Sequence, residues 1–396
     1  MTQRQIKTGV FLLTAFNSIG TTYYFNYIYF FARKEFGFDR LQNMVLAAAL
    51  GFAYMVASIL GGRFAQRRGY FRSLRVGFFT MAVTLLAGAR IASLPGQIAI
   101  MFIATIGMCF TWPALEALIS EEEPVARLQR MVGIYNLTWA GAGALAYFTG
   151  GALLDRFGLR SMFYVPAVIH GLQFLGAWWL EQKSKRPISA KKSAGADDFP
   201  VGLLERPISK VSPKTFLTMA WLANPFAYLA VNTIFAVMPS LAAGLHLSNS
   251  EAGFYGSLWM FVRTASFLFL WKWTGWHYRF RWLATAYVAM VVGFTVVLFA
   301  PGIPVWLMAQ ICFGAALGLI YYSSLFYSMD AGERKGEHGG IHEAAIGAGN
   351  CAGPAMGAAA LYFFPQHVQS GTWAVSGCLV VGLAGLIWLR WRKEHG

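Results

Sequence analysis

One arginine interrupts a long apolar stretch of the sequence, where a charged side chain is costly. Arg263 lies about halfway along residues 251–271. The same helical face would carry Tyr255, Trp259 and Ser266. A buried guanidinium stays charged and presents a planar fork of N–H donors that fits a carboxylate or a phosphate. The pattern predicts a cation that recognises an anion. The alternative is a structural arginine bonded to carbonyl groups or to a neighbouring acid.

Polar and aromatic side chains recur at helical spacing in other apolar stretches. They are Asn17, Thr21, Tyr24 and Tyr27 in the first stretch, Thr105, Cys109, Trp112 and Glu116 in the fourth, Asn224, Tyr228 and Asn232 in the seventh, Gln310, Gly314, Gly318, Tyr321 and Ser324 in the tenth, and Asn136 and Asn350 in the fifth and eleventh. Helices with a polar stripe need a polar interior to face, so these side chains are candidates for lining a substrate cavity. Hydrogen bonds between helices and aromatic anchors at the membrane surface are the alternative role.

Three titratable side chains are candidates for moving a proton within such an interior. Glu343 and His342 stand at the start of one apolar stretch, and Glu116 stands near the end of another. Histidine is the side chain whose charge is most easily switched near neutral pH. A glutamate in the first turn of a helix is also favoured by the helix dipole, so Glu343 has a structural alternative. His170 is interpreted as a packed or lipid-facing histidine.

The composition indicates a membrane environment for all of these side chains. The chain has 396 residues, of which 57% are hydrophobic and 12% are charged, whereas a soluble domain has about 25% charged residues. Too little polar surface remains to coat a chain of this size, which excludes an ordinary soluble enzyme and a disordered protein. The net charge of +15 comes from basic residues placed between apolar stretches, so no nucleic-acid partner is expected.

Motifs of catalytic and metal sites are missing from the sequence. It has no Walker loop, no HExxH and no GxSxG. The four cysteines fall within apolar stretches and form no CxxC pair, which argues against a disulfide framework and a zinc site. We therefore expect a protein that is not an enzyme and that needs no cofactor and no metal.

Twelve apolar stretches are long enough to cross a bilayer, which takes about 20 residues each. They lie near residues 8–31, 41–60, 73–92, 97–118, 131–152, 161–180, 214–242, 251–271, 282–300, 304–327, 341–363 and 371–390. One connection is long and basic, at residues 181–213. The predicted organisation is an N-terminal six-helix bundle at 1–180, a cytoplasmic linker at 181–213 and a C-terminal six-helix bundle at 214–396.

The distribution of basic residues predicts the orientation. With the N-terminus in the cytoplasm, the inner segments hold 25 of the 32 lysines and arginines, whereas the outer segments hold six. Inner loops of membrane proteins carry this excess of positive charge. We expect a multi-pass protein of the cell (inner or plasma) membrane with both termini in the cytoplasm, and the first apolar stretch is interpreted as an uncleaved span.

Internal repeats relate the two halves of the chain. At an offset of 207 residues, Asn17 matches Asn224 and Gly150 matches Gly357. Within the first half, the segment after the second stretch matches the segment after the fifth stretch, 89 residues later. These two segments would lie on opposite sides of the membrane, so the three-helix units are inverted. Nested inverted repeats are an architecture of secondary transporters, whose sites lie near the midplane.

The chain resembles transporters of the major facilitator superfamily over essentially its whole length. The segment from Gly62 to Arg72 resembles the family signature G-x-L-A-D-R-x-G-R-R, with Gln66 in the place of the acid. The copy from Gly151 to Arg160 keeps the acid as Asp155. The antiporter pattern G-x8-G-x3-G-P-x2-G-G has its match in the eleventh stretch. That match consists of Gly340, Gly349, Gly353, Pro354 and Gly357, followed by Ala358.

The span count, the repeats and the resemblance together predict an all-α membrane protein. It would have twelve transmembrane helices in two pseudo-symmetric six-helix bundles, each built of two inverted three-helix repeats. The resemblance also implies gate residues, namely Gly62, Arg67, Gly69, Arg72, Asp155, Arg156, Gly353 and Pro354. The basic side chains after the second span would face acids near the inner surface, namely Glu116, Glu121, Glu122, Glu123 and Glu343. A monomer is typical of the family.

The leading hypothesis is a secondary active transporter of a small organic anion that works by alternating access. Arg263 would bind the anionic group of the substrate, and Trp259, Tyr228 and Tyr24 would pack around the rest of the substrate. Protons are the candidate coupling ion, and Glu343 or His342 would bind them. One alternative is a multidrug-type efflux antiporter for amphipathic compounds. A non-transporting membrane receptor and a lipid transporter are further alternatives. The expected partners are a small-molecule substrate and the lipid bilayer.

Overall fold

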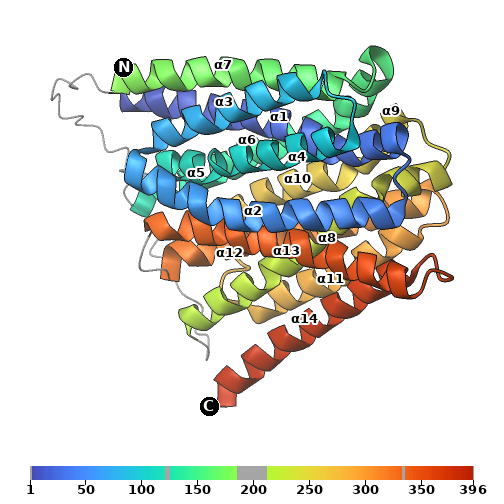
Figure 1. Cartoon of the computed structure of the whole chain (residues 1–396). Coiled ribbons are helices and arrows are strands. Elements are labelled where there is room, and N and C mark those ends of the chain that lie inside the picture. Colours follow the sequence, from blue (N-terminus) through green and yellow to red (C-terminus); the bar gives the residue numbers. More distant parts are fainter. Residues whose placement is uncertain (1, 121–124, 185–211, 332–334, 396) are drawn as a thin grey trace.

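The structure is a computed structural model that describes residues 2–120, 125–184, 212–331 and 335–395. Fourteen helices and no strand occur in this part of the chain (Figure 1). Those of the first half are α1 (Gln3–Phe36), α2 (Arg40–Arg68), α3 (Tyr70–Gly88), α4 (Leu94–Cys109), α5 (Trp112–Ser120), α6 (Val125–Phe157) and α7 (Ser161–Ser184). Those of the second half are α8 (Pro213–Gly244), α9 (Asn249–Gly256), α10 (Leu258–Lys272), α11 (Phe280–Phe299), α12 (Ile303–Ala331), α13 (Lys335–Phe363) and α14 (Ser370–His395).

Two pairs of consecutive helices each form one span, which gives the twelve predicted spans. Helices α4 and α5 are separated at Phe110 and Thr111, just before Pro113. Proline has no N–H to donate, so the backbone tightens there and the Thr111 N–H bonds to the Met108 carbonyl at 2.9 Å. Helices α9 and α10 are separated at Ser257.

Eight spans within the described ranges are long and apolar enough to cross a membrane. They are α2, α3, α4 with α5, α6, α8, α11, α12 and α14. Helices α1, α7, α9, α10 and α13 fall outside this group. The polar side chains singled out above occur on some of these helices and also on α4, α5, α6, α8 and α12. The protein is an all-helical, multi-pass membrane protein, as predicted. Most of the linker expected at 181–213 lies outside the described residues, since α7 ends at Ser184 and α8 begins at Pro213.

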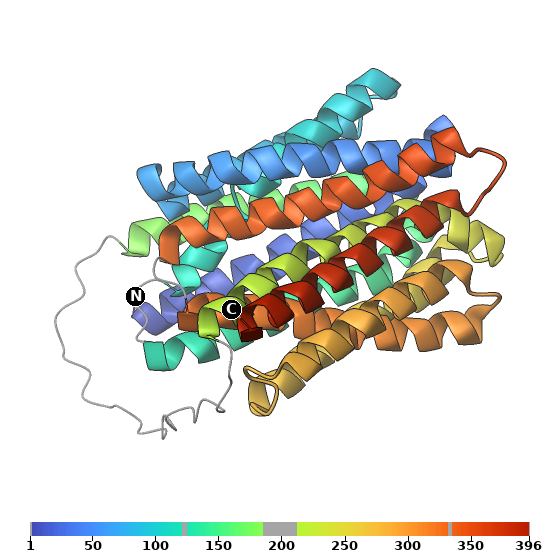
Figure 2. The same cartoon turned by 90° about the horizontal axis from the view of Figure 1, so that it is seen from below.

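The helices form two six-span bundles, α1 to α7 and α8 to α14 (Figures 1 and 2). The bundles meet along α2 with α13 and along α6 with α9 and α10. Gly51 of α2 lies against the backbone of Asn350 and Cys351, and Gly347 of α13 lies against the backbone of Met55. Small residues let helix backbones approach closely where lipid supplies no hydrophobic driving force.

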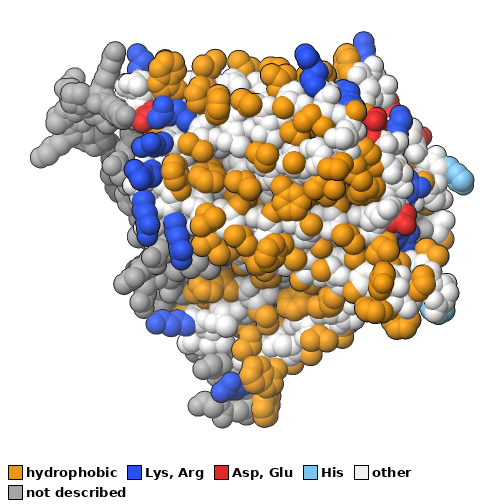
Figure 3. Space-filling model, in the orientation of Figure 1, with side chains coloured by type: hydrophobic (Ala, Val, Ile, Leu, Met, Phe, Trp, Pro, Cys, Tyr) orange, Lys and Arg blue, Asp and Glu red, His pale blue; other side chains and the backbone are white. Residues whose placement is uncertain are grey.

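Both termini lie at the same end of the helices, which we call the terminal end (Figure 1). On the face that Figure 3 shows, Lys and Arg side chains line this end, whereas the flank is covered by hydrophobic side chains. Large apolar side chains such as Leu60, Leu172 and Trp179 are more than half exposed. Lipid tails would cover such a flank in a membrane.

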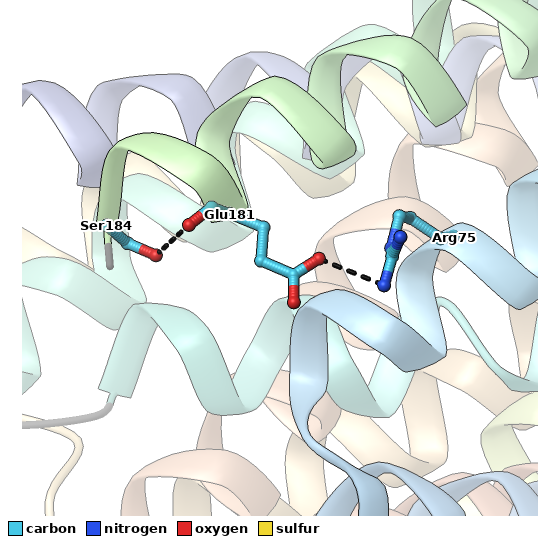
Figure 4. A network of polar contacts seen from close by, with 3 residues as sticks. All are labelled: Arg75, Glu181 and Ser184. Atoms are coloured by element: carbon cyan, nitrogen blue, oxygen red, sulfur yellow. Dashed lines mark hydrogen bonds and ion pairs between the residues drawn. The ribbon is translucent and has the colours of Figure 1, made fainter. Parts of the chain in front are cut away.

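An ion pair between two helices makes a small contribution within the first bundle. In the first bundle, Arg75 of α3 forms an ion pair with Glu181 of α7 at 3.1 Å, beside Ser184 (Figure 4). The pair is partly exposed, so it contributes no more than about 1 kcal/mol. Nearby, the buried His170 ring of α7 stacks on Phe78 of α3 with the ring centroids 6.2 Å apart.

Candidate functional site

A cavity of about 230 Å³ lies between the two bundles. The first bundle contributes Ser18, Thr22, Phe25, Asn26, Tyr29, Leu50, Gly51, Tyr54, Thr105, Met108, Trp112, Tyr135 and Trp139. The second bundle contributes Tyr228, Val231, Asn232, Phe235, Tyr321, Glu343, Ile346 and Asn350. Nine of these twenty-one residues are aromatic, five of them tyrosines, and seven others carry hydroxyl, amide or carboxyl groups. This chemistry suits a small ligand with an organic body.

Arg263 lies beside the cavity without lining it. Its side chain is 6% exposed, and its Nε has no hydrogen-bond partner among the described residues. The guanidinium carbon is 4.7 Å from the ring centroid of Trp139 and 5.0 Å from that of Trp259. Tyr228 and Tyr321 are close enough to interact with it electrostatically. The positive charge is therefore stabilised by aromatic rings, an arrangement in which a desolvated cation gains about 2 kcal/mol per ring.

Glu343 of α13 lines the cavity and is 7% exposed. The hydroxyl of Tyr54 on α2 donates a hydrogen bond to its Oε2, so this contact joins the two bundles. Glu116 of α5 is close enough to Glu343 to interact electrostatically. Its Oε2 is buried and has no hydrogen-bond partner in the described parts of the chain. Two acids from different bundles thus lie near one another in a poorly solvated region, where a proton on one of them would relieve their repulsion.

Asparagine side chains connect helices around the cavity. Asn232 of α8 donates through Nδ2 to the Asn350 carbonyl at 2.7 Å and accepts at Oδ1 from the Tyr29 hydroxyl at 3.4 Å. Asn17 donates to Thr111 at 3.2 Å, away from the cavity lining. Such bonds hold helix positions in a medium that offers no water.

The structure brings only some of the sequence-predicted residues together. Thr105, Trp112, Tyr228, Asn232, Tyr321, Glu343 and Asn350 line the cavity. The others, Arg263, Trp259, Tyr255, Asn17, Thr21, Tyr24, Tyr27, Asn136, Asn224, His342 and Glu116, lie outside its lining. Tyr27 donates to the Tyr147 carbonyl at 2.6 Å, and the Tyr24 ring packs on Phe163. These tyrosines hold helices of the first bundle together.

Several aromatic residues of the cavity were not predicted from the sequence. Tyr54, Tyr135 and Trp139 line it, although none of them was singled out from the sequence. The four-residue spacing of Tyr135 and Trp139 was a usable signal, because it puts both rings on one face of α6. Tyr54 had no comparable signal, since its partner Glu343 is 289 positions away in the chain.

Hydrogen bonds join the bundles at the end opposite the terminal end. Asp155 of α6 accepts from the Asn249 amide at 2.8 Å and from the Ser250 N–H at 2.8 Å, at the N-terminus of α9. Arg33 donates to the Ser240 hydroxyl at 3.0 Å. Arg40 donates to the Val368 carbonyl at 3.0 Å. These contacts connect α6 with α9, α1 with α8, and α2 with the segment between α13 and α14. They hold the two bundles together at the opposite end.

The other predicted gate residues lie apart from this set. Arg67 and Arg72 are exposed at the terminal end, on either side of Gly69, which has a φ of 94° between α2 and α3. Gly62 is half-buried on α2, and Arg156 is exposed with its guanidinium 5.6 Å from the Phe157 ring. In α13, Gly353 packs on the backbone of Leu229, one residue before the buried Pro354. Glu121, Glu122 and Glu123 lie outside the described residues.

Comparison with known sequences finds one family over most of the chain. The model of the Major Facilitator Superfamily matches residues 10–354. The quinate permease of Neurospora terricola is 28% identical over 169 residues, which are 39% of this chain and 32% of that protein. The chain therefore matches about a third of that relative's length. The quinolone resistance protein NorA of Staphylococcus aureus (strain MRSA252) is 21% identical over 372 residues, which are 91% of this chain and 90% of that protein.

Solved structures of similar shape cover nearly the whole chain. The nucleoside transporter NupG has a TM-score of 0.66 at 15% identity, over 97% of this chain and 99% of its own. The human organic anion transporter MFSD10 (TETRAN) has a TM-score of 0.66 at 13% identity, over 98% of this chain and 100% of its own. At these identities the likeness concerns the fold alone.

Proposed function

The chain belongs to the Major Facilitator Superfamily of membrane transporters, and on that premise we propose that it moves a small organic anion across the membrane by alternating access. The observation that carries this proposal is Arg263. It is a buried cation beside the cavity between the bundles, and no acid pairs with it in the described part of the chain. A permanent positive charge kept unpaired in a membrane is costly unless an anion uses it.

Alternating access is supported by the placement of the hydrogen bonds between the bundles. The opposite end is tied by Asp155, Arg33 and Arg40, whereas the cavity lies between these contacts and the terminal end. We assign the terminal end, with both chain termini, to the cytoplasm, because basic residues gather there. The structure would then be an inward-facing state. Residues 1–180 and 214–396 would rock against each other as units joined by the linker 181–213.

Proton coupling is assigned to Glu343, with Glu116 and His342 as further members of the pathway. Glu343 faces the cavity, and its hydrogen bond to Tyr54 crosses between the bundles. A change in its protonation would therefore alter a contact that must change when the bundles rock. The name of one sequence relative, a quinate permease, agrees with a carboxylate substrate.

Efflux of amphipathic compounds is the second candidate. The cavity walls are rich in aromatic rings, such as Phe25, Trp112 and Phe235, and the full-length relative NorA is a quinolone resistance protein. Aromatic walls accept many organic bodies, whereas an unpaired arginine selects for negative charge. Arg263 is the reason that we rank the organic anion first.

A thermal-shift comparison tests the proposal. Purified wild type, Arg263→Ala and Arg281→Ala are heated with quinate, benzoate, inorganic phosphate, a sugar and a cationic dye. A ligand that binds only the folded state raises the melting temperature. The Arg281→Ala control removes an exposed arginine at the start of α11. We expect a carboxylate to stabilise wild type and the control but not Arg263→Ala. Stabilisation by the dye alone, or of all three proteins equally by carboxylates, would favour efflux.

A further inference from the structure

The guanidinium of Arg263 contacts one indole ring from each bundle. Trp259 stands four residues earlier on the same helix, α10, and therefore moves with Arg263. Trp139 belongs to α6 of the other bundle. The two ring centroids are at nearly equal distances from the guanidinium carbon, 5.0 Å and 4.7 Å. The contact with Trp259 is therefore internal to a bundle, whereas the contact with Trp139 exists only while the two bundles keep their present arrangement.

Trp139 both lines the cavity and contacts Arg263. Arg263 itself is 6% exposed and does not line the cavity. The aromatic rings of Phe267 and Tyr321 surround the same indole, with ring centroids 5.9 and 5.3 Å away. The face of the guanidinium that contacts this indole becomes open to a ligand only when the indole moves.

The position of Trp139 is fixed from its own bundle. Its Nε1 donates to the Asn136 side-chain oxygen at 3.0 Å, and the Ser18 hydroxyl donates to its backbone carbonyl at 2.6 Å. The hydrogen-bonding edge of the ring is thus held by α6 itself, and its face is left for the cation of the other bundle. Displacing the ring requires breaking the cation–π contact but no hydrogen bond between the bundles.

We propose that Trp139 is a lid over Arg263 that an anionic substrate must displace, so that substrate binding and the loss of a contact between the bundles are one event. The proposal rests on the proposed function, because it takes an anion as the ligand. The lid competes with the ligand for the same cation. While the lid is closed, that fraction of the protein cannot bind the ligand. Removing the lid therefore raises the apparent affinity for the ligand, by the factor by which the closed state had lowered it.

The first arm of the test measures access to Arg263 without any substrate. Purified protein is treated with phenylglyoxal, which modifies arginine, and the modification of Arg263 is followed by mass spectrometry. We expect Trp139→Ala to raise the labelling rate about tenfold, Trp139→Phe to give an intermediate rate, and Trp259→Ala to change it less. Unchanged labelling in both Trp139 variants overturns the lid. Trp139→Phe keeps a ring in place and covers the case in which Trp139→Ala fails to fold.

The second arm measures how quinate protects Arg263 from the reagent. The concentration of quinate that halves labelling should fall about tenfold in Trp139→Ala and rise in Trp259→Ala, because Trp259 is a fixed platform. Weaker protection in Trp139→Ala overturns the lid and makes Trp139 a platform as well. If neither quinate nor benzoate protects any variant while Trp139→Ala still speeds labelling, the anion assignment fails and the cover over Arg263 stands.

Discussion

Arg263 and Glu343 are ionisable side chains buried near the same cavity, yet their surroundings differ in kind. Arg263 contacts the rings of Trp139 and Trp259, which stabilise its charge without using its N–H donors. Glu343 accepts a hydrogen bond from Tyr54, which occupies one carboxylate oxygen. The cation keeps its donors for a ligand, whereas the acid already bonds to the other bundle. The difference favours Arg263 as the substrate group and Glu343 as the coupling group.

Tyr228 stands between the two regions. It lines the cavity and interacts electrostatically with both Arg263 and Glu343. A ligand beside Tyr228 would therefore be influenced by both charges, although it would bond to one. This arrangement allows the two roles to be separated by substitutions on each side.

The largest effect is expected on the cationic side. Arg263→Ala should lower uptake of organic carboxylates into proteoliposomes about a hundredfold or more, because a buried charge-assisted pair is lost. Arg263→Lys should recover part of the activity, since an ammonium supplies the charge but not the planar fork. Arg281→Ala is the matched control. Full activity of Arg263→Ala would make the arginine structural and remove the contrast with Glu343.

A smaller effect, of a different kind, is expected on the acidic side. Glu343→Gln should abolish the stimulation of transport by a pH gradient, about tenfold, while exchange of substrate across the membrane at equal pH continues. The amide cannot take up or release a proton, but it can still accept from Tyr54. Transport is measured at several pH gradients in proteoliposomes. If the gradient dependence survives, the coupling role passes to Glu116 or His342.

Removal of the tyrosine hydroxyl tests whether the acid is held between the bundles. Tyr54→Phe leaves a buried carboxylate oxygen without its donor, which costs about 1–3 kcal/mol. We expect a melting temperature several degrees lower in detergent. Tyr164→Phe, at an exposed site on α7, is the control. Equal melting temperatures for both variants would mean that the Tyr54 contact contributes nothing to stability.

The smallest effect is expected at an acid in contact with solvent. Asp155→Ala removes the bonds to Asn249 and Ser250 at the opposite end, and exposed bonds of this kind contribute about 1 kcal/mol. Opening at this end should become about fivefold more frequent. The readout is the reaction of an impermeant maleimide with Asn26→Cys in a chain whose four cysteines are replaced. An unchanged rate of maleimide reaction would mean that the Asp155 bonds do not control access at this end and that the buried charges alone do.

The fold followed from the sequence because the apolar stretches indicated the spans, whereas the internal repeats and the segments Gly62–Arg72 and Gly151–Arg160 indicated the family. Arg263 stood out because a charged residue within an apolar stretch can be recognised from the sequence alone. Its role stays a prediction. The neighbours were not visible, because Trp139 looks like any packed tryptophan and Tyr54 meets Glu343 only after the bundles associate.

The close contact of α2 with α13 also constrains how this protein can diverge. A side chain at Gly51 would meet the backbone of Asn350 and Cys351, and one at Gly347 would meet the backbone of Met55. Enlarging either residue forces the same two helices apart and so opens space at the other position. We therefore expect positions 51 and 347 to vary together through evolution, so that both residues are small or both are large. Engineering of the contact between α2 and α13 should start by replacing both residues at once.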